Sequence, residues 1–104
     1  MSKVIAVDFD GCLCANQWPR IGAANNNAIR ALIRLREQGA RVILWTCRTG
    51  ARLEEAVAWC ERRGLTFDAV NDNLPDRVAQ YGGDTRKVSA DEYWDDLAVT
   101  VRCG

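Results

Sequence analysis

Apolar residues in this chain gather in short runs that are typical of buried strands. Residues 3–7, Lys-Val-Ile-Ala-Val, form a run that is too short for a helix and rich in β-branched side chains. Residues 41–45 and 67–70 form two similar runs, and residues 88–94 form a fourth. Continuous runs of this kind are typical of strands that are covered on both faces. The pattern therefore predicts four strands, with a short fifth over residues 97–101 at an edge.

The segments between the first three runs have helical periodicity. Ala28, Leu32 and Leu35 recur at helical spacing, with asparagines at 25–27 as caps and Gly39 as a stop. A second amphipathic segment carries apolar residues at the same spacing and ends at a glycine: Leu53, Ala56, Val57, Cys60 and Gly64. Strands that alternate with helices indicate parallel crossovers, so we expect an α/β, Rossmann-like fold with helices on both faces of the sheet.

Two stretches have weaker patterns. Between Cys12 and the first helix we expect an irregular flap. Its Trp18 is either a ring that stacks on a substrate or a side chain that fills a hydrophobic gap beneath the flap, as a plug. Residues 71–75 predict a turn, residues 76–81 a short helix and residues 82–83 a loop.

The amino-acid composition excludes several classes of partner and of catalytic site. The 104 residues suit a single domain, residues 1–104, and 14 basic residues balance 14 acidic ones. A chain with this balance lacks the net positive charge whose electrostatic field would attract nucleic acid or an anionic membrane surface. The chain has no histidine, which excludes serine and cysteine nucleophiles activated by histidine and zinc held by histidine. Any catalysis must use carboxylates, lysine, hydroxyls, thiols or a hard metal ion.

The cysteines and the amino terminus predict a cytoplasmic protein. Five cysteines form an odd number without any CxxC pair, which favours reduced thiols. The amino terminus leads directly into the first strand rather than into a signal peptide. No apolar run approaches the roughly 20 residues that cross a bilayer.

Polar residues follow the predicted strands at the sheet edge where parallel sheets bind ligands. They are Asp8, Asp10, Thr46, Asn71, Asp72, Asp95 and Asp96, with Lys87 just before the fourth strand. Each has an ordinary structural reading: a turn for Asp-x-Asp-Gly, a cap for Thr46, surface charge for Lys87. Their joint occurrence at one edge favours a site, and clustered carboxylates suit Mg²⁺ with a phosphate substrate.

The order of these motifs resembles the haloacid dehalogenase (HAD) superfamily, in its branch of magnesium-dependent phosphatases. The four motifs are Asp8-Phe9-Asp10-Gly11, Thr46, Lys87 and Asp95-Asp96. Residues 18–22 and 44–48 further resemble a small capless bacterial hydrolase-like group in that superfamily. The resemblance implies a three-layer fold with a mainly parallel sheet and no cap domain, and hydrolysis of a small phosphorylated metabolite.

The same resemblance implies a role for each motif. Asp8 would be the nucleophile that forms an aspartyl-phosphate, and Asp10 the general acid and base. Thr46 would donate a hydrogen bond to a phosphoryl oxygen, and Lys87 would offset the negative charge. Asp95 and Asp96 would hold Mg²⁺ together with Asp8 and the main-chain carbonyl of Asp10.

Candidate substrate-binding residues lie next to these motifs and in the flap. Gly11 lets the chain turn so that both acids face one pocket, and Cys12 stands where the superfamily usually has threonine. Cys47 lies beside Thr46, and Arg20 and Arg48 are candidates to hold a second anionic group. Without a cap, selectivity would fall to the flap, to Arg48, to the loop at residues 71–72, or to a partner subunit. A homodimer would cover the minimal far edge of the sheet.

Two other classes of protein carry a similar set of acidic, threonine and lysine residues. A phosphoacceptor receiver domain also carries acids, a threonine and a lysine, but its acceptor follows the third strand and its threonine the fourth. Here Thr46 follows the second strand, and Asp10 is the acid and base that a long-lived phosphoryl switch omits. The remaining alternative is a metal- or phosphate-binding protein of this fold without turnover.

Overall fold

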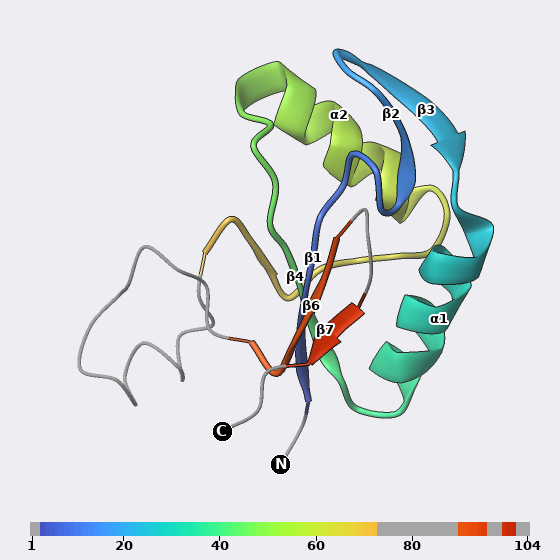
Figure 1. Ribbon diagram of the computed structural model, residues 1–104, viewed down its shortest axis with the longest axis vertical. Helices are drawn as coiled ribbons and strands as arrows, with labels where there is room; N and C mark the ends of the chain where they lie inside the picture. The colour runs from blue at the N-terminus through green and yellow to red at the C-terminus, as the bar shows by residue number, and fades with distance from the viewer. Residues whose placement is uncertain (1–2, 73–89, 96–98, 102–104) are drawn as a thin grey trace.

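A five-stranded sheet forms the centre of the protein, in the order β5-β4-β1-β6-β7 (Figure 1). The structure is a computed structural model and describes residues 3–72, 90–95 and 99–101. The strands are β1 (Val4–Val7), β4 (Arg41–Leu44), β5 (Ala69–Val70), β6 (Glu92–Trp94) and β7 (Val99–Val101). β5, β4, β1 and β6 are mutually parallel, and β7 is antiparallel at the edge. The predicted strands and the α/β class are therefore confirmed.

β1 is the central strand because its side chains are apolar on both faces. It pairs with β4 on one side and with β6 on the other. All of its residues are buried, and they divide between two apolar clusters. Ile5 and Val7 belong to the larger cluster, whereas Val4 and Ala6 belong to the smaller one. This alternation shows that both faces of the strand are covered.

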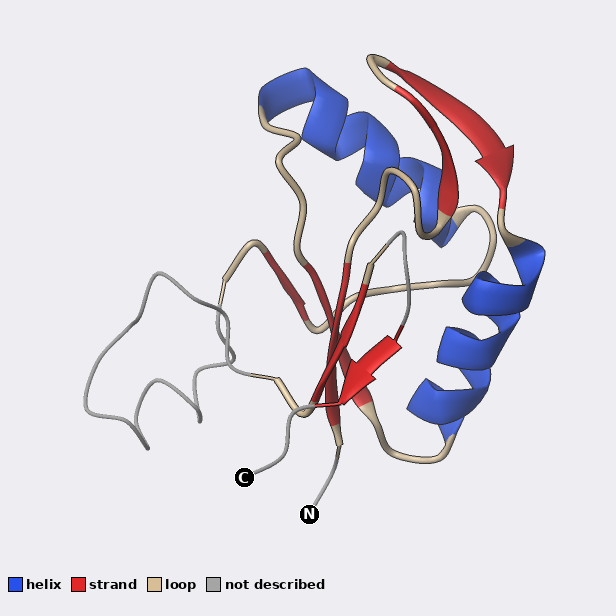
Figure 2. Ribbon diagram, viewed as in Figure 1, coloured by secondary structure: helices blue, strands red, loops and turns tan. Residues whose placement is uncertain are grey.

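Two helices among the described residues cover one face of the sheet. α1 (Asn26–Glu37) connects β1 to β4, and α2 (Gly50–Glu61) connects β4 to β5 (Figure 2). The Asn25 side chain caps α1 by accepting a hydrogen bond from the Ala28 amide at 3.3 Å, and Gly39 follows the helix with a φ of 101°. These ends agree with the sequence prediction.

Both described helices pack on the face of the larger cluster. Leu32 of α1 and Trp59 of α2 are buried in this cluster together with Val7 of β1. The Trp59 ring also meets Phe9 edge to face, at 5.4 Å between ring centroids. The expected arrangement with helices on both faces is thus not shown. The predicted helix at 76–81 and the predicted loop at 82–83 lie outside the described residues.

The segment that we expected to be an irregular flap is a regular hairpin. β2 (Cys14–Gln17) and β3 (Arg20–Ala24) pair antiparallel and form a second, two-stranded sheet. The hairpin rises beyond the end of β1 beside α2 (Figure 1). Gly22 permits this pairing, since a Cβ atom there would lie 2.3 Å from the Ala15 carbonyl oxygen. The prediction of an irregular segment was wrong because these strands are mostly exposed and lack an apolar alternation.

Within the described part of the chain, neither helix is long and apolar enough to span a membrane.

Candidate functional site

The chain turns sharply where β1 ends. The Asp8 amide donates a hydrogen bond of 2.8 Å to the Trp94 carbonyl, which continues the pairing of β1 with β6. Asp8 Oδ1 then accepts the Phe9 amide at 2.8 Å. Gly11 has a φ of 90°, a conformation that favours glycine, and the Leu13 amide closes the turn on the Phe9 carbonyl at 3.0 Å. The turn that the Asp-x-Asp-Gly motif predicted is therefore present.

A cavity of about 210 Å³ lies at this end of the sheet, on the face opposite α1 and α2. Residues from three neighbouring strand ends line it: Ala6, Val7, Asp8, Trp45, Tyr93, Trp94 and Asp95. The fold thus brings Asp8 and Asp95 to one cavity from opposite ends of the sequence. Trp45, which is 38% exposed, adds an aromatic surface beside these two carboxylates.

Asp10 forms a bidentate ion pair with Arg48. Arg48 Nε lies 2.8 Å from Asp10 Oδ2, and Arg48 Nη2 lies 2.7 Å from Asp10 Oδ1. The hydrogen bonds that Arg48 donates to Asp10 raise the pKa of Arg48 above its ordinary value, against the effect of burial. Asp10 is not among the residues that line the cavity with Asp8. The shared pocket that we expected for the two acids stays a prediction.

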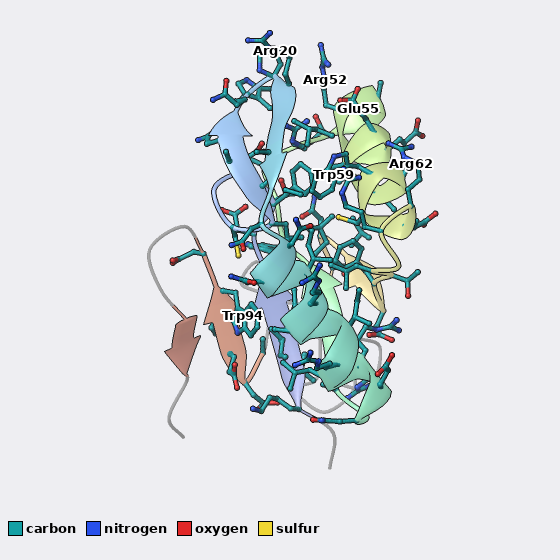
Figure 3. The ribbon with its side chains drawn as sticks, turned by 90° about the vertical axis from the view of Figure 1, so that its right-hand side faces the viewer. Arg20, Arg52, Glu55, Trp59, Arg62 and Trp94 are labelled. Atoms are coloured by element: carbon teal, nitrogen blue, oxygen red, sulfur yellow. The ribbon has the colours of Figure 1, made fainter. Side chains whose placement is uncertain are left out.

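Arg48 is buried rather than available on the surface. Its side chain is 1% exposed, and its guanidinium also donates to the carbonyl oxygens of Pro19 (3.3 Å) and Arg20 (3.1 Å). The guanidinium carbon lies 4.9 Å from the ring centroids of both Phe9 and Trp18. The candidate anion contact is therefore occupied by protein groups. The Arg20 side chain extends outward from the hairpin (Figure 3).

Thr46 joins the loops that follow β4 and β5. Its amide donates to Asn71 Oδ1 at 2.7 Å, and its hydroxyl oxygen accepts the Arg48 amide at 3.2 Å. Asn71 has a φ of 52° and donates from Nδ2 to the Arg48 carbonyl at 3.5 Å. Thr46 thus follows the end of β4 and makes local contacts, whereas the N-cap of α2 is Thr49, so the cap that was one reading of Thr46 is not seen. The neighbouring Cys47 is an exposed free thiol.

The described residues supply only part of the predicted metal site. Asp96 lies outside them, as does the predicted catalytic Lys87. No group of three or more aspartate, glutamate, cysteine or histidine side chains within residues 3–72, 90–95 and 99–101 could hold a metal ion. Asp8 and Asp95 are hard oxygen donors of the kind that Mg²⁺ binds. They fit the ion in chemical type, although two carboxylates are fewer than the predicted set.

Sequence reasoning missed the aromatic residues of the cavity. A signal for them was present, because side chains two positions apart on a strand point to the same face. Trp45 lies two residues after Ile43 of the smaller cluster, and Tyr93 lies two residues before Asp95. For Trp18, 57% exposed, the structure shows a ring stacked on Arg48.

No family model matches the chain, and no curated protein matches it. One solved structure does match the chain. It is described as the structure of the conserved protein coded by locus from Bacteroides thetaiotaomicron. It is 40% identical, with a TM-score of 0.82, over 93% of this chain and 78% of that chain. The chain belongs to the family of that protein. The likeness extends over nearly the whole chain, so the family shares its α/β fold.

Proposed function

We propose that the protein is a magnesium-dependent phosphohydrolase that cleaves a phosphate monoester of a small metabolite. Its full fold would be three-layered and without a cap domain, as the resemblance to the HAD superfamily implies. The observation that supports this best is the meeting of Asp8 and Asp95 at one cavity beyond the ends of β1 and β6. Two carboxylates from distant parts of the sequence in one cavity supply hard oxygen donors of the kind that Mg²⁺ binds.

In this proposal the chain performs two successive displacements. Asp8 attacks phosphorus in line, the bond to the leaving oxygen breaks, and Asp10 gives that oxygen a proton. Asp10, now a carboxylate, takes a proton from water, which attacks the aspartyl-phosphate and releases phosphate. Thr46 and Lys87 hold and neutralise the phosphoryl oxygens.

The ion would be held by Asp8, the Asp10 carbonyl, Asp95 and Asp96. Mg²⁺ bound there supplies electrophilic stabilisation of the phosphoryl charge. Because Asp10 is paired with Arg48, its carboxylate has to leave the guanidinium before it can reach a leaving group.

The first experiment compares phosphate release by the wild type and by Asp8→Asn across a panel of phosphorylated metabolites and one aryl phosphate. We expect Mg²⁺-dependent release from the wild type, its loss in excess chelator, and recovery when Mg²⁺ is restored. Asp8→Asn should lose activity by at least about a thousandfold while circular dichroism stays unchanged, because the covalent step has no other nucleophile.

Glu37→Gln is the matched control, since it removes an exposed carboxylate at the end of α1. It should retain the wild-type rate. Full activity of Asp8→Asn, or of the wild type in excess chelator, would exclude the proposed mechanism.

The Asp10–Arg48 pair favours a second candidate, a protein that binds a metal ion or phosphate without turnover. In that case the acid and base group would be permanently held by its guanidinium partner. Calorimetric titration with Mg²⁺ and with inorganic phosphate separates the two candidates. Binding that depends on Asp8, with no release from any member of the panel, would support the second.

A further inference from the structure

We infer that Arg48 is a positioning residue that couples the β2–β3 hairpin to the Asp10 carboxylate. The hairpin is closed while Asp10 is paired with Arg48, and it opens when the pair is broken. Only the consequence for catalysis rests on the proposed function, because it uses Asp10 as the acid and base. The coupling itself concerns contacts among described residues.

The Arg48 guanidinium contacts both Asp10 and the tip of the hairpin. Two of its hydrogen bonds go to Asp10, at the end of β1, and two go to the carbonyl oxygens of Pro19 and Arg20, at the tip of the hairpin. Nη2 is shared, since it donates both to Asp10 and to Arg20. A planar group with a fixed fork of donors cannot turn toward one set of acceptors without moving from the other.

Two aromatic rings, those of Phe9 and Trp18, pack against the guanidinium. Phe9 precedes Asp10 and is fully buried, whereas Trp18 is in the turn of the hairpin and largely exposed. Both ring centroids lie 4.9 Å from the guanidinium carbon. Trp18 therefore covers Arg48 from the solvent side, and the ring must move away if the arginine is to be hydrated.

The hairpin has little other burial along its length. Of the β2 residues only Cys14 is buried, and in β3 Ile21 and Ala24 are partly buried against the larger cluster. Its base is fixed by the Asn25 amide, which donates to the Leu13 carbonyl at 2.8 Å. A two-stranded hairpin is at best marginally stable by itself. The contacts of the tip with Arg48 and Trp18 should therefore contribute strongly to the closed state.

Loss of the Asp10–Arg48 ion pair favours opening of the hairpin. Arg48 stays protonated, and with Asp10 removed it becomes a buried charge without its counter-ion, which is strongly unfavourable. Movement of the hairpin tip would let water reach the guanidinium. In the proposed hydrolase, the orientation of the acid and base group and access to the site would then change together.

Hydrogen–deuterium exchange of the folded chain tests the coupling without any assay of activity. We expect Asp10→Asn and Arg48→Lys each to speed the exchange of β2 and β3 amides by about tenfold or more, the size that loss of charge-assisted hydrogen bonds implies. Amides of β1 and β4 should keep their wild-type protection. The double variant should exchange no faster than the faster single variant, because both break the same pair.

Arg52→Lys is the control, since Arg52 is a half-exposed α2 arginine that pairs with Glu55 on the same helix. It should leave hairpin exchange unchanged. Trp18→Ala, at an exposed position, should speed hairpin exchange even if the Asp10 or Arg48 variant fails to fold. Wild-type protection of the hairpin in the folded variants, or additive effects in the double variant, would overturn the coupling whether or not the protein hydrolyses phosphate.

Discussion

At the scale of single residues, Glu92 is a buried acid with two partners. It is 9% exposed and lies in β6, beside the central strand. Lys3 Nζ lies 2.6 Å from one of its carboxylate oxygens, and Trp94 Nε1 donates to the other at 3.0 Å. The hydrogen bond from Lys3 and then that from Trp94 lower the pKa of Glu92, against the opposing effect of burial.

This lowered pKa predicts a defined loss of stability in acid. Because the folded chain holds the Glu92 proton less tightly than the unfolded chain, the ionised carboxylate stabilises the fold above the ordinary pKa of 4.5. That contribution disappears as the pH falls through the lowered pKa. Urea unfolding at several pH values should show a smaller loss of free energy below pH 4.5 in Glu92→Gln than in the wild type. An equal loss in both would contradict the assignment.

Individual site residues were predictable only where a strand end determined their position. Asp8 and Asp95 follow apolar runs directly, so the topology of a parallel sheet was enough to place them together. The pairing of Asp10 with Arg48 joins residues 38 positions apart in two different loops, and no local sequence pattern predicts such a contact. Lys87 and Asp96 stay predictions, since they lie outside the described residues.

At the scale of elements, Gly22 is the residue on which the hairpin most depends. The Ala15 carbonyl oxygen approaches the position of its absent side chain from the opposite strand. The hairpin was not predictable as regular structure, since β2 is exposed beyond Cys14 and β3 is at most partly buried, so neither strand has a clear apolar alternation. The helices were predictable because each must bury one apolar stripe.

Substitution of Gly22 tests this close approach. Gly22→Ala should force β2 and β3 apart, because a Cβ atom 2.3 Å from a carbonyl oxygen cannot be accommodated without a backbone shift. We expect faster amide exchange across the hairpin, with little change in α1. Gly39→Ala is a contrasting control: nothing lies near its Cβ position, so its effect comes from its φ of 101° and should leave the hairpin intact. Unchanged hairpin exchange in Gly22→Ala would show that the strands separate easily.

At the scale of the whole molecule, Asp68 connects α1 to two strands. Its Oδ2 accepts the Val42 amide at 2.7 Å, and its Oδ1 pairs with Arg36 Nη2 at 3.1 Å. The Asp68 amide in turn donates to the Val42 carbonyl at 2.8 Å. This residue therefore links the end of α1, the start of β4 and the approach to β5.

Asp68→Ala should reduce the free energy of unfolding by about 1–3 kcal/mol, mainly because the Val42 amide loses its acceptor. The ion pair with Arg36 is partly exposed and should contribute less than about 1 kcal/mol of this. Asp68→Asn keeps an acceptor and should therefore lose less than Asp68→Ala in chemical denaturation. An equal loss in both variants would assign the effect to the ion pair instead.

The overall fold was predictable because apolar runs and amphipathic helices alternate along the chain. The face of the sheet on which each helix packs was harder to predict, because an apolar stripe along a helix is compatible with packing on either face. Successive crossovers in one direction along β1, β4 and β5 put both described helices on the same face.

The central place of β1 has a consequence for biosynthesis. One flank of this strand pairs with β4, which the ribosome makes soon afterwards, but the other flank pairs with residues of β6 as distant as Glu92. Until those residues emerge, a nascent chain carries an open and strongly apolar strand edge, the kind of surface that promotes aggregation and recruits chaperones. Fragments that stop short of β6 should for the same reason be poorly behaved, even though they contain both described helices.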